Sequence, residues 1–360
     1  MFNRILVPLD GSMLAERAIP HAEQFARIFG SSIILLQILD PASYHENPKP
    51  VDPLSWQIRK AEADMYLQGV AARIRENLQE STGDTKNAHN KGSVDRKTRV
   101  EYSILEGKTA ENIVNYAHNE NIDLLVICTH GSGGLSRWNI SSVTQKVINL
   151  VYLPVLIVRA YEQPETVLGG VHYRHILCPI DSSRRAECSL SAGIALARGK
   201  PSLASKADNG ALRRTAPVAS PAKTRLILAA VIKPPELPIP EPYPVEVEQL
   251  SQQMMEVRRT AVRNYLNEMK ERLPVECEIY VLENTSVSAA IQELASQKEE
   301  IDLVVLCAHG YTGQFEWPYG SIARNYIEHG TKHVLVIQDV PLSKVRASVA
   351  EIAAEKSGGR

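Results

Sequence analysis

The sequence predicts an α/β protein made of two tandem domains, each with a parallel sheet covered by helices on both faces. The chain has 360 residues, and domains of about 150 residues are common, so the length fits two of them. Short β-branched apolar runs alternate with longer segments of helical periodicity, which is typical of a parallel sheet wrapped in helices. In addition, the segment 121–134 recurs almost unchanged at 300–313, so the chain contains the same unit twice.

Three pairs of segments define this internal repeat. The sequence NIDLLVICTHGSGG at 121–134 aligns without gaps with EIDLVVLCAHGYTG at 300–313. Two shorter pairs flank it, namely 4–12 with 175–183 and 154–158 with 333–337. The repeat predicts a first domain at 1–160 and a second at 172–340, followed by a tail at 341–360.

The composition excludes several classes of protein. Forty basic residues balance forty-one acidic ones, so the chain lacks the excess positive charge that binds a nucleic-acid backbone. Five cysteines without a CxxC pair predict reduced thiols, as in cytosolic proteins. The longest strongly apolar runs, 33–36 and 303–306, are far shorter than a membrane span of about 18 residues. Because Met1–Arg4 runs straight into an apolar strand, we expect no leader and a cytoplasmic protein.

Five strands are expected in each domain. In the first domain they are 3–9, 32–39, 98–105, 123–129 and 154–159. In the second domain they are 175–180, 225–232, 275–282, 302–308 and 333–338. Three polar or proline-rich segments predict loops, namely 81–97, 200–224 and 233–244. The segment 200–224, an insert found only in the second domain, is expected to be flexible.

Two helices have a clear apolar face. The first follows the first strand, with Ser12 as its expected N-cap. Its apolar positions recur every three or four residues, and they are Ala15, Ala18, Ala22, Phe25, Ala26 and Phe29. The second is a long helix at 246–272 in the second domain. Its buried stripe is predicted to contain Ala261, Tyr265, Leu266, Met269 and Leu273.

Polar residues follow the first and fourth strands of each domain at matching positions. Asp10 and Asp181 come just after the first strand, and His130 and His309 come just after the fourth. In open parallel sheets, ligands bind beyond the carboxyl ends of the strands, where the strand order reverses. If the first and fourth strands are neighbours, these residues meet in one crevice per domain.

Glycines and serines follow each of these histidines. In the first domain they are Gly131, Gly134, Ser141 and Ser142, with Val143 next in a helix. In the second domain the matching residues are Gly310, Gly313, Gly320, Ser321 and Ile322. Glycines let backbone N–H groups approach an anion, and a helix N-terminus adds a positive dipole end. The pattern predicts a phosphate site, although glycines that only turn a strand into a helix also explain it.

Simpler roles are open for the other candidate residues. Asp10 and Asp181 are also suitable N-caps for the helix that follows. The sequence pairs neither histidine with a nucleophile or a carboxylate, so a role in the loop competes with general-base catalysis. Cys128 and Cys307 fit buried thiols inside the fourth strand. No His, Asp or Glu cluster has metal-ligand spacing, so any Mg²⁺ is expected to be held through phosphates.

At these residues the sequence resembles a tandem universal stress protein of the ATP-binding type, and the resemblance covers both domains. Nucleotide-binding members of that family have an Asp after the first strand, then G-x-x-G, a spacer and G-[S/T]. The second domain keeps these glycines and the serine, whereas the first has Ser141 in place of a glycine. Both spacers have six residues, fewer than in the family pattern. Because Ser141 fits only with a negative φ, we expect the second site to bind more tightly.

The resemblance implies that each domain binds ATP. It puts the aspartates beside the adenosine and the backbone at Ile38 and Val231, near the end of the second strand, at the adenine edge. It puts the glycines and serines, with the neighbouring histidines, at the phosphates. The implied fold is Rossmann-like, with a five-stranded sheet in the order 3-2-1-4-5 in each domain. The last strands would meet across the domain boundary, as in a homodimer fused into one chain.

The implied function is that of a cytoplasmic ATP-binding module of a stress response, whose nucleotide occupancy is read by an unidentified protein partner. Little or no catalysis is expected. One alternative is an enzyme that slowly hydrolyses ATP or transfers a nucleotidyl group, and another is a nucleotide-free dimeric scaffold. Neither nucleic acid nor a membrane is expected as a partner, and a further homodimer of the fused pair stays open.

Overall fold

The structure is a computed structural model of the chain, and it describes residues 1–41, 52–80, 99–131, 140–161, 170–199, 224–236, 243–298, 300–311 and 318–340. The predicted loop at 81–97, the predicted insert apart from Thr224, and the tail at 341–360 lie outside the described residues. Two of the candidate site residues, Gly134 and Gly313, also lie outside them.

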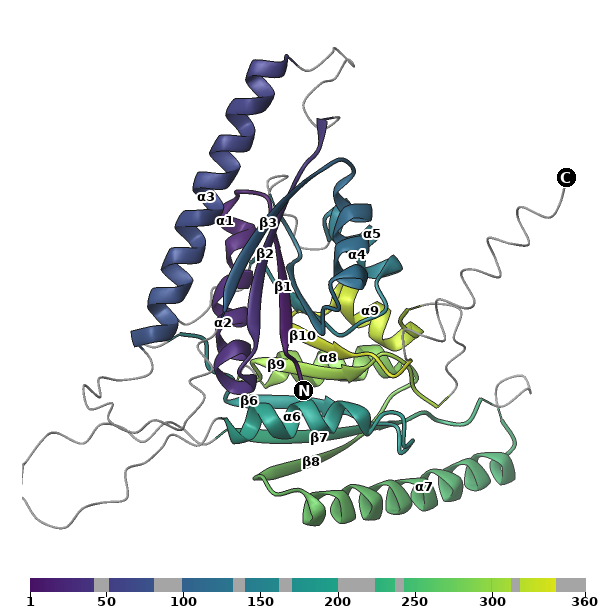
Figure 1. Cartoon of the computed structure of the whole chain (residues 1–360). Helices are drawn as coiled ribbons and strands as arrows, with labels where there is room; N and C mark the ends of the chain where they lie inside the picture. Colours follow the sequence, from purple (N-terminus) through teal and green to yellow (C-terminus); the bar gives the residue numbers. More distant parts are fainter. Residues whose placement is uncertain are drawn as a thin grey trace, which may run out of the picture.

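The described residues contain the five predicted strands of each domain, with ends within two residues of those expected (Figure 1). The first domain contains β1 (Arg4–Leu9), α1 (Met13–Glu16), α2 (Ala18–Phe29), β2 (Ser32–Leu39), α3 (Pro53–Glu80), β3 (Val100–Glu106), α4 (Thr109–Asn119), β4 (Leu124–Cys128), α5 (Ser142–Leu150) and β5 (Val155–Val158). The second contains β6 (His175–Pro179), α6 (Cys188–Arg198), β7 (Arg225–Ile232), α7 (Val245–Arg272), β8 (Cys277–Glu283), α8 (Val287–Gln297), β9 (Leu303–Cys307), α9 (Ser321–His329) and β10 (His333–Ile337).

All of these strands join one sheet in the order β3-β2-β1-β4-β5-β10-β9-β6-β7-β8. Counted within its own domain, each half has the order 3-2-1-4-5, so the predicted fold class is confirmed. Neighbouring strands are parallel except at the domain boundary, where β5 and β10 pair antiparallel and the last strands meet as expected. Because that central pair is antiparallel, the carboxyl ends of the strands lie at opposite edges of the sheet in the two domains.

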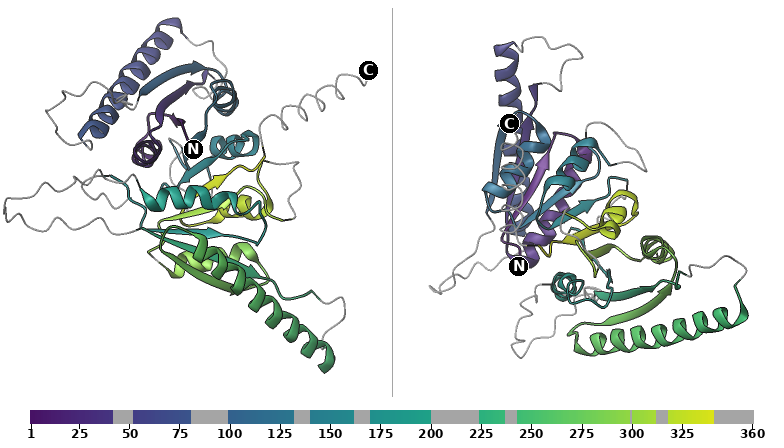
Figure 2. Two further views of the ribbon diagram at one scale, coloured as in Figure 1. Left: turned by 60° about the horizontal axis from the view of Figure 1, so that its bottom comes forward. Right: turned by 90° about the vertical axis from the view of Figure 1, so that its right-hand side faces the viewer.

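Helices cover both faces of the sheet, and the two long ones, α3 and α7, lie at opposite ends of the molecule (Figures 1 and 2). Side chains alternate along each strand, so Ile5 and Val7 join one core while Leu6 joins the other. The first core lies under α2, α3, α6 and α7, and the second lies under α4, α5, α8 and α9. Among the described helices, none is both long and apolar enough to cross a membrane.

The two helices with predicted apolar faces form, each with one difference. Ser12 is the N-cap, as predicted, but Arg17 divides the first helix into the short α1 and the longer α2. In α7 the prediction for Ala261 is wrong, because that residue is exposed and Val262 packs on the core instead. Ala261 lies five residues before the buried Leu266, which puts it about 140° away around the helix at 3.6 residues per turn.

Buried hydrogen bonds connect the two domains next to the central pair of strands, β5 and β10. Arg159, just after β5, is 2% exposed. Its guanidinium donates to the carbonyl oxygens of Tyr326 at 2.7 Å and Ile327 at 2.8 Å, which satisfies the C-terminal end of α9. In the reverse direction, the Tyr319 hydroxyl donates to the carbonyl oxygen of Leu153 at 3.1 Å. The tandem chain thus forms the predicted intramolecular pseudo-dimer.

Two buried histidines lie at the same junction. The rings of His21 in α2 and His333 in β10 meet edge to face, with centroids 4.5 Å apart. His21 Nδ1 shares a hydrogen bond of 2.7 Å with the Tyr173 hydroxyl, just before β6. Burial lowers the pKa of His21 to about 3 and holds the pKa of His333 well below its usual range. Both rings are therefore neutral near pH 7, and they connect an element of the first domain to the start of the second.

Candidate functional site

In the first domain, the loops that follow β1 and β4 meet at the carboxyl edge of the sheet. The two strands are direct neighbours, with Ile5 opposite Leu124. Gly131, after β4, lies so close to Asp10, after β1, that a Cβ on the glycine would overlap the carboxylate. The close approach of these two loops therefore requires a glycine at position 131.

The second domain repeats this arrangement between β6 and β9. A Cβ on Gly310 would lie 2.5 Å from Asp181 Oδ2, again too close for any side chain. The backbone N–H of Tyr311 donates to the same carboxylate oxygen at 2.7 Å, so the carboxylate fixes the loop that follows β9. Both copies of the sequence repeat thus bring the aspartate and the glycine together at the carboxyl edge of their own half of the sheet. We call the place around Asp10 and Gly131 the first crevice and the place around Asp181 and Gly310 the second.

Neither aspartate is a helix N-cap, so that alternative is wrong. The Ser12 N–H donates to Asp10 Oδ1 at 3.0 Å, and the Ser12 Oγ accepts a hydrogen bond of 3.1 Å from the Ala15 N–H. In the second domain Asp181 Oδ1 accepts from the N–H of Ser183 at 3.0 Å and from its hydroxyl at 2.6 Å. Ser12 caps α1, whereas Ser183 Oγ accepts a hydrogen bond of 3.1 Å from the Ala186 N–H in the turn before α6, whose N-cap is Glu187. The exposed aspartates fix the loops that begin with them.

The starts of α5 and α9 are held by hydrogen bonds to the residues that directly follow β4 and β9. The Ser141 N–H donates to the Thr129 carbonyl oxygen, and the Gly320 N–H donates to the Ala308 carbonyl oxygen, both at 2.8 Å. Ser142 and Ser321, the exposed first residues of α5 and α9, follow them. The N–H groups of a first helical turn have no partner within the helix, so both helix starts can receive an anion.

The serine that replaces glycine in the first domain is not strained. Ser141 has a φ of −57° and Gly320 has a φ of −66°, so neither position needs the left-handed region. Ser141 Oγ accepts a hydrogen bond of 3.1 Å from the Thr144 N–H and donates to Thr144 Oγ1 at 2.9 Å. The sites differ here in helix capping, and backbone strain gives no reason for the second site to bind more tightly.

The remaining predicted residues lie around these crevices. Ile38 and Val231 are half-buried at the carboxyl ends of β2 and β7, which neighbour β1 and β6. Val143 and Ile322 are the second residues of α5 and α9. Every predicted site residue that the structure describes therefore comes from the carboxyl edge of its own domain.

The two histidines have different partners, and the difference was missed in the sequence. His130 Nδ1 lies 3.0 Å from Thr129 Oγ1, the hydroxyl of its own neighbour. His309 Nδ1 donates to Asp339 Oδ1 at 2.7 Å, and Arg185 Nε lies 3.2 Å from the other oxygen of that carboxylate. The counterparts of Asp339 and Arg185 in the first domain are Ala160 and Leu14. A search for repeated residues passes over this group, whereas a comparison of the copies for differences would have found it.

The predicted core thiols also differ between the domains. Cys128 is buried, and burial raises the pKa of its thiol. The prediction for Cys307 is wrong in part, because that residue is only half-buried and its sulfur lies 3.0 Å from the Cys188 sulfur. Cys188 is the first residue of α6, and the first domain has Arg17 at the matching position.

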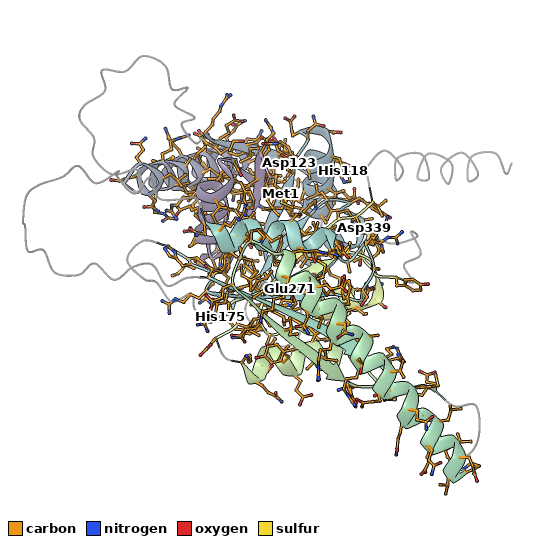
Figure 3. All side chains as sticks on the ribbon, turned by 90° about the horizontal axis from the view of Figure 1, so that it is seen from below. Met1, His118, Asp123, His175, Glu271 and Asp339 are labelled. Atoms are coloured by element: carbon orange, nitrogen blue, oxygen red, sulfur yellow. The ribbon has the colours of Figure 1, made fainter. Side chains whose placement is uncertain are left out.

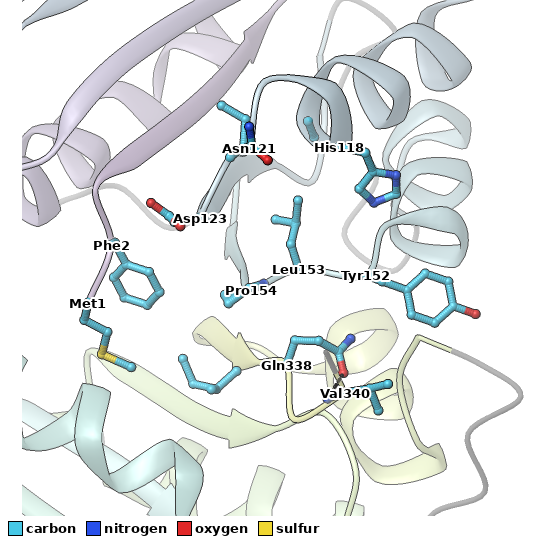
Figure 4. Close-up of a pocket in the computed structure, with 13 residues that line it drawn as sticks. Met1, Phe2, His118, Asn121, Asp123, Tyr152, Leu153, Pro154, Gln338 and Val340 are labelled. Atoms are coloured by element: carbon cyan, nitrogen blue, oxygen red, sulfur yellow. Dashed lines mark hydrogen bonds between the residues drawn. The ribbon is translucent and has the colours of Figure 1, made fainter. Parts of the chain in front are cut away.

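A pocket of about 360 Å³ lies between the two domains, where the amino edge of the first half of the sheet meets the carboxyl edge of the second (Figure 4). Met1, Asp123 and Leu153 line it at the amino ends of the first-domain strands, and Gln338 and Val340 close it from the second domain. None of the predicted site residues lines it. Figure 3 shows Asp339 and His175 well apart on either side of the second domain, and His175, as the first residue of β6, lies at the edge of the sheet away from the second crevice. Among the described residues, no three His, Cys, Asp or Glu side chains are grouped as metal ligands.

Comparisons with known proteins agree with the internal repeat. The sequence model of the universal stress protein family matches residues 1–159 and 203–338. Universal stress protein MJ0577 of Methanocaldococcus jannaschii is 29% identical over 170 residues, covering 44% of this chain and 96% of that protein. The second family match starts after β6, although β6 lies between β9 and β7 in the sheet. The domain limits at 160 and 172 therefore stay a prediction.

Solved structures match the tandem arrangement as a whole. The functionally unknown protein PA1789 of Pseudomonas aeruginosa PAO1 has a TM-score of 0.61 at 15% identity and covers 98% of both chains. A universal stress protein from Archaeoglobus fulgidus has a TM-score of 0.55 at 13% identity, covering 93% of this chain and 96% of that one. At such identities the similarity shows the fold alone. Another universal stress protein has been solved in complex with cAMP.

Proposed function

Because the chain belongs to the universal stress protein family, we propose that each of its domains binds one adenine nucleotide, with ATP as the ligand, at the carboxyl edge of its sheet. Nucleotide binding is known for members of the family. The observation that carries the proposal is the repeated close packing of Asp10 on Gly131 and of Asp181 on Gly310, each beside the N-terminus of a helix. Because the two glycines have no side chain, the loop backbone at these positions is accessible to a phosphate.

In this proposal each part of the crevice recognises one part of the nucleotide. The aspartates face the ribose hydroxyls, and the backbone near Ile38 and Val231 faces the adenine edge. The phosphates lie against the loops after His130 and His309 and against the first turns of α5 and α9. A Mg²⁺ ion would be held through the phosphates, since phosphate oxygens and water are its usual ligands in nucleotide sites.

The proposed role is that of a cytoplasmic module that reports nucleotide occupancy to a protein partner, with little or no catalysis. Binding of a ligand shifts a conformational equilibrium only by its difference in affinity for the two states. The loops that carry the aspartates and glycines connect directly to β1, β4, β6 and β9 at the centre of each half-sheet. In this proposal, nucleotide binding therefore acts on the loops that are connected most directly to the central strands of each half of the sheet.

Acidic substitutions at the two helix starts test the proposal. Ser142→Glu and Ser321→Glu each place a negative charge on an exposed first-turn residue, which stabilises the helix but repels a phosphate. ATP titrated calorimetrically should bind at least about tenfold more weakly at the altered site, a loss of about 1.4 kcal/mol. Ser142→Gln and Ser321→Gln are the matched controls and should bind nearly as the wild type does. Unchanged ATP binding in both Glu variants would contradict the proposed sites.

A second candidate function, slow hydrolysis of ATP in the second domain, is favoured by the pairing of His309 with Asp339. A base oriented by a carboxylate is the arrangement that activates a nucleophile in many hydrolases. The His309 side chain is fully buried, however, so water would have to enter the crevice to reach it. If the wild type releases phosphate from ATP and Asp339→Asn abolishes that release, the result would support hydrolysis. If the wild type releases phosphate no faster than ATP does in buffer alone, the protein binds ATP without hydrolysing it.

A further inference from the structure

We propose that Cys188 and Cys307 form a reversible disulfide when the protein is exposed to a peroxide, and that this bridge joins the start of α6 to the end of β9, next to the second crevice. The two sulfur atoms already lie 3.0 Å apart in the reduced protein. They come from the first residue of α6 and the last residue of β9, two elements that are far apart in sequence and in contact in the fold.

The surroundings of Cys188 suit a reactive thiolate. It is half-buried at the N-terminus of α6, an 11-residue helix whose dipole favours a negative charge there. The hydrogen bond that Cys188 shares with the Cys307 thiol, and to a smaller degree the charge of Arg185, lower the pKa of Cys188. The same hydrogen bond, together with burial, raises the pKa of Cys307. Cys188 is thus the attacking thiolate, and Cys307 is the thiol that resolves the product.

The other three cysteines do not share these surroundings. Burial raises the pKa of Cys277 to about 11 and raises those of Cys128 and Cys178. Cys128 holds the same place in the first domain as Cys307 does in the second, but Arg17 stands where Cys188 would be needed. The first domain therefore serves as an internal control, because it has one thiol of the pair and not the other.

The chemistry is balanced with hydrogen peroxide as the oxidant. The Cys188 thiolate attacks one oxygen of the peroxide, the O–O bond breaks, and the second oxygen leaves as water after it takes up a proton. The Cys307 sulfur then attacks the resulting sulfenic acid, so the S–S bond forms and a second water molecule leaves. Two thiols and one peroxide thus give one disulfide and two waters. A dithiol reductant reverses the bridge by exchange.

The bridge would act directly on the candidate site of the second domain. Cys188 ends the loop that begins with Asp181, and Cys307 lies three residues before Gly310. Asp181 and Gly310 are in close contact across the crevice. A covalent bond between the start of α6 and the end of β9 would limit how far the loops attached to them can separate. The proposal concerns the thiols themselves, so it stands or fails independently of nucleotide binding.

Thiol mapping on the full chain tests the proposal. The reduced protein is treated with one equivalent of hydrogen peroxide, the remaining thiols are alkylated, and a non-reducing digest is examined by mass spectrometry. We expect the peptides of Cys188 and Cys307 to appear as one cross-linked species, with two of the five thiols lost and recovered by dithiothreitol. If Cys188 and Cys307 are alkylated after the peroxide treatment to the same extent as the buried Cys178, they have not been oxidised, and the proposal would be overturned. A bridge between other cysteines, between two chains, or oxidation to sulfinic acid without a bridge would also overturn it.

Two variants separate the roles of the sulfurs. In Cys307→Ser the oxidation should stop at the sulfenic acid of Cys188, which a dimedone-type probe labels. In the matched control Cys128→Ser, the bridge should form as in the wild type, because that thiol belongs to the other domain. Labelling of Cys128 in place of Cys188 would contradict the assignment of the reactive sulfur.

Discussion

The guanidinium of Arg159, which follows the last strand of the first domain, donates a hydrogen bond of 2.7 Å to the carbonyl oxygen of Tyr326 near the end of α9 in the second domain. This bond and its neighbour at Ile327 use a buried side chain of one domain as the C-terminal cap of a helix in the other. The fusion of the two domains is therefore specified by a polar contact as well as by the antiparallel pairing of β5 with β10.

Removal of this cap should destabilise the whole chain. We expect Arg159→Leu to lower the free energy of unfolding by about 3 kcal/mol, because the carbonyl oxygens of Tyr326, Ile327 and Lys332 would lose the guanidinium as a donor, although that of Tyr326 keeps the Gly330 N–H. The matched control is Gln338→Leu at the equivalent position of the second domain, where a bond to the Pro318 carbonyl and longer bonds from the Asp339 and Val340 N–H groups are lost. Because this side chain is only half-buried and water can replace those partners, the cost should be smaller, about 1–2 kcal/mol. Urea denaturation of both variants gives the comparison, and equal losses would contradict the role of Arg159.

The buried histidines should make the protein sensitive to acid. His21 has a folded-state pKa of about 3, whereas its ordinary value is 6.5. Between these two pH values His21 is protonated in the unfolded chain but not in the folded chain. Its contribution to the free energy of unfolding is therefore complete above pH 6.5 and is lost as the pH falls toward 3. Each such histidine contributes a slope of up to about 1.4 kcal/mol per pH unit. His333, whose pKa is also lowered, acts in the same direction.

His21→Gln tests the assignment of this slope. The variant keeps a neutral polar side chain beside the Tyr173 hydroxyl but has no group that titrates. We expect the free energy of unfolding of the variant to fall less steeply between pH 6.5 and pH 4.5 than that of the wild type. The difference in slope should correspond to one fewer proton taken up on unfolding. Chemical denaturation at a series of pH values measures the slope, and an identical slope in both proteins would contradict a neutral buried His21.

The long helices are anchored by one contact that occurs in both domains. The Tyr66 hydroxyl of α3 donates to Glu16 Oε1 at 3.0 Å, and the Tyr265 hydroxyl of α7 donates to Glu187 Oε1 at 2.8 Å. Tyr66→Phe and Tyr265→Phe should each cost about 0.5–1.5 kcal/mol of stability. A double-mutant cycle with Glu16→Ala should show that Tyr66 loses most of its effect once the acceptor of its hydrogen bond is gone. Additive losses would show that the hydrogen bond contributes nothing.

The contact between Asp10 and Gly131 should be required for the geometry of the first crevice. Gly131→Ala introduces a Cβ that overlaps the carboxylate, and overpacking of this kind costs about 1–3 kcal/mol. Asp10→Ala in the same chain removes the overlapping group and should restore most of that stability. Thermal unfolding of the single and double variants measures the rescue. A double variant no more stable than Gly131→Ala alone would show that another contact makes the glycine necessary.

The sequence alone predicts nearly all of the fold. The alternation of apolar runs predicts each strand, because residues such as Ile5 and Leu6 must face opposite cores in a sheet covered on both sides. The internal repeat then predicts that Asp10 and Asp181 have equivalent surroundings, and their contacts with Gly131 and Gly310 agree with this. Helix faces are predicted less accurately, as Ala261 shows, because apolar spacing alone does not fix the rotation of a long helix with one side in solvent.

The parts that sequence analysis missed are those in which the two copies differ. Cys188, Asp339 and Arg185 have no counterparts of the same chemistry in the first domain, so the repeat contains no signal for them. Arg159 is missed for another reason. Its partners are backbone carbonyl oxygens of Tyr326 and Ile327, and the identity of a residue carries no information on which carbonyl groups need a donor.

The central claim is that each of the two domains binds one adenine nucleotide, and native mass spectrometry of the full chain with ATP tests it most directly. The wild type should carry two ATP molecules per chain at saturation. At an ATP concentration near the wild-type Kd, Ser142→Glu and Ser321→Glu should each lose most of the occupancy of one site, and the double variant should lose most of the occupancy of both. A chain that shows no bound ATP at about 1 mM, where binding contributes only about 4 kcal/mol, would contradict the claim. An ATP occupancy near the wild-type Kd that neither substitution changes would contradict it as well.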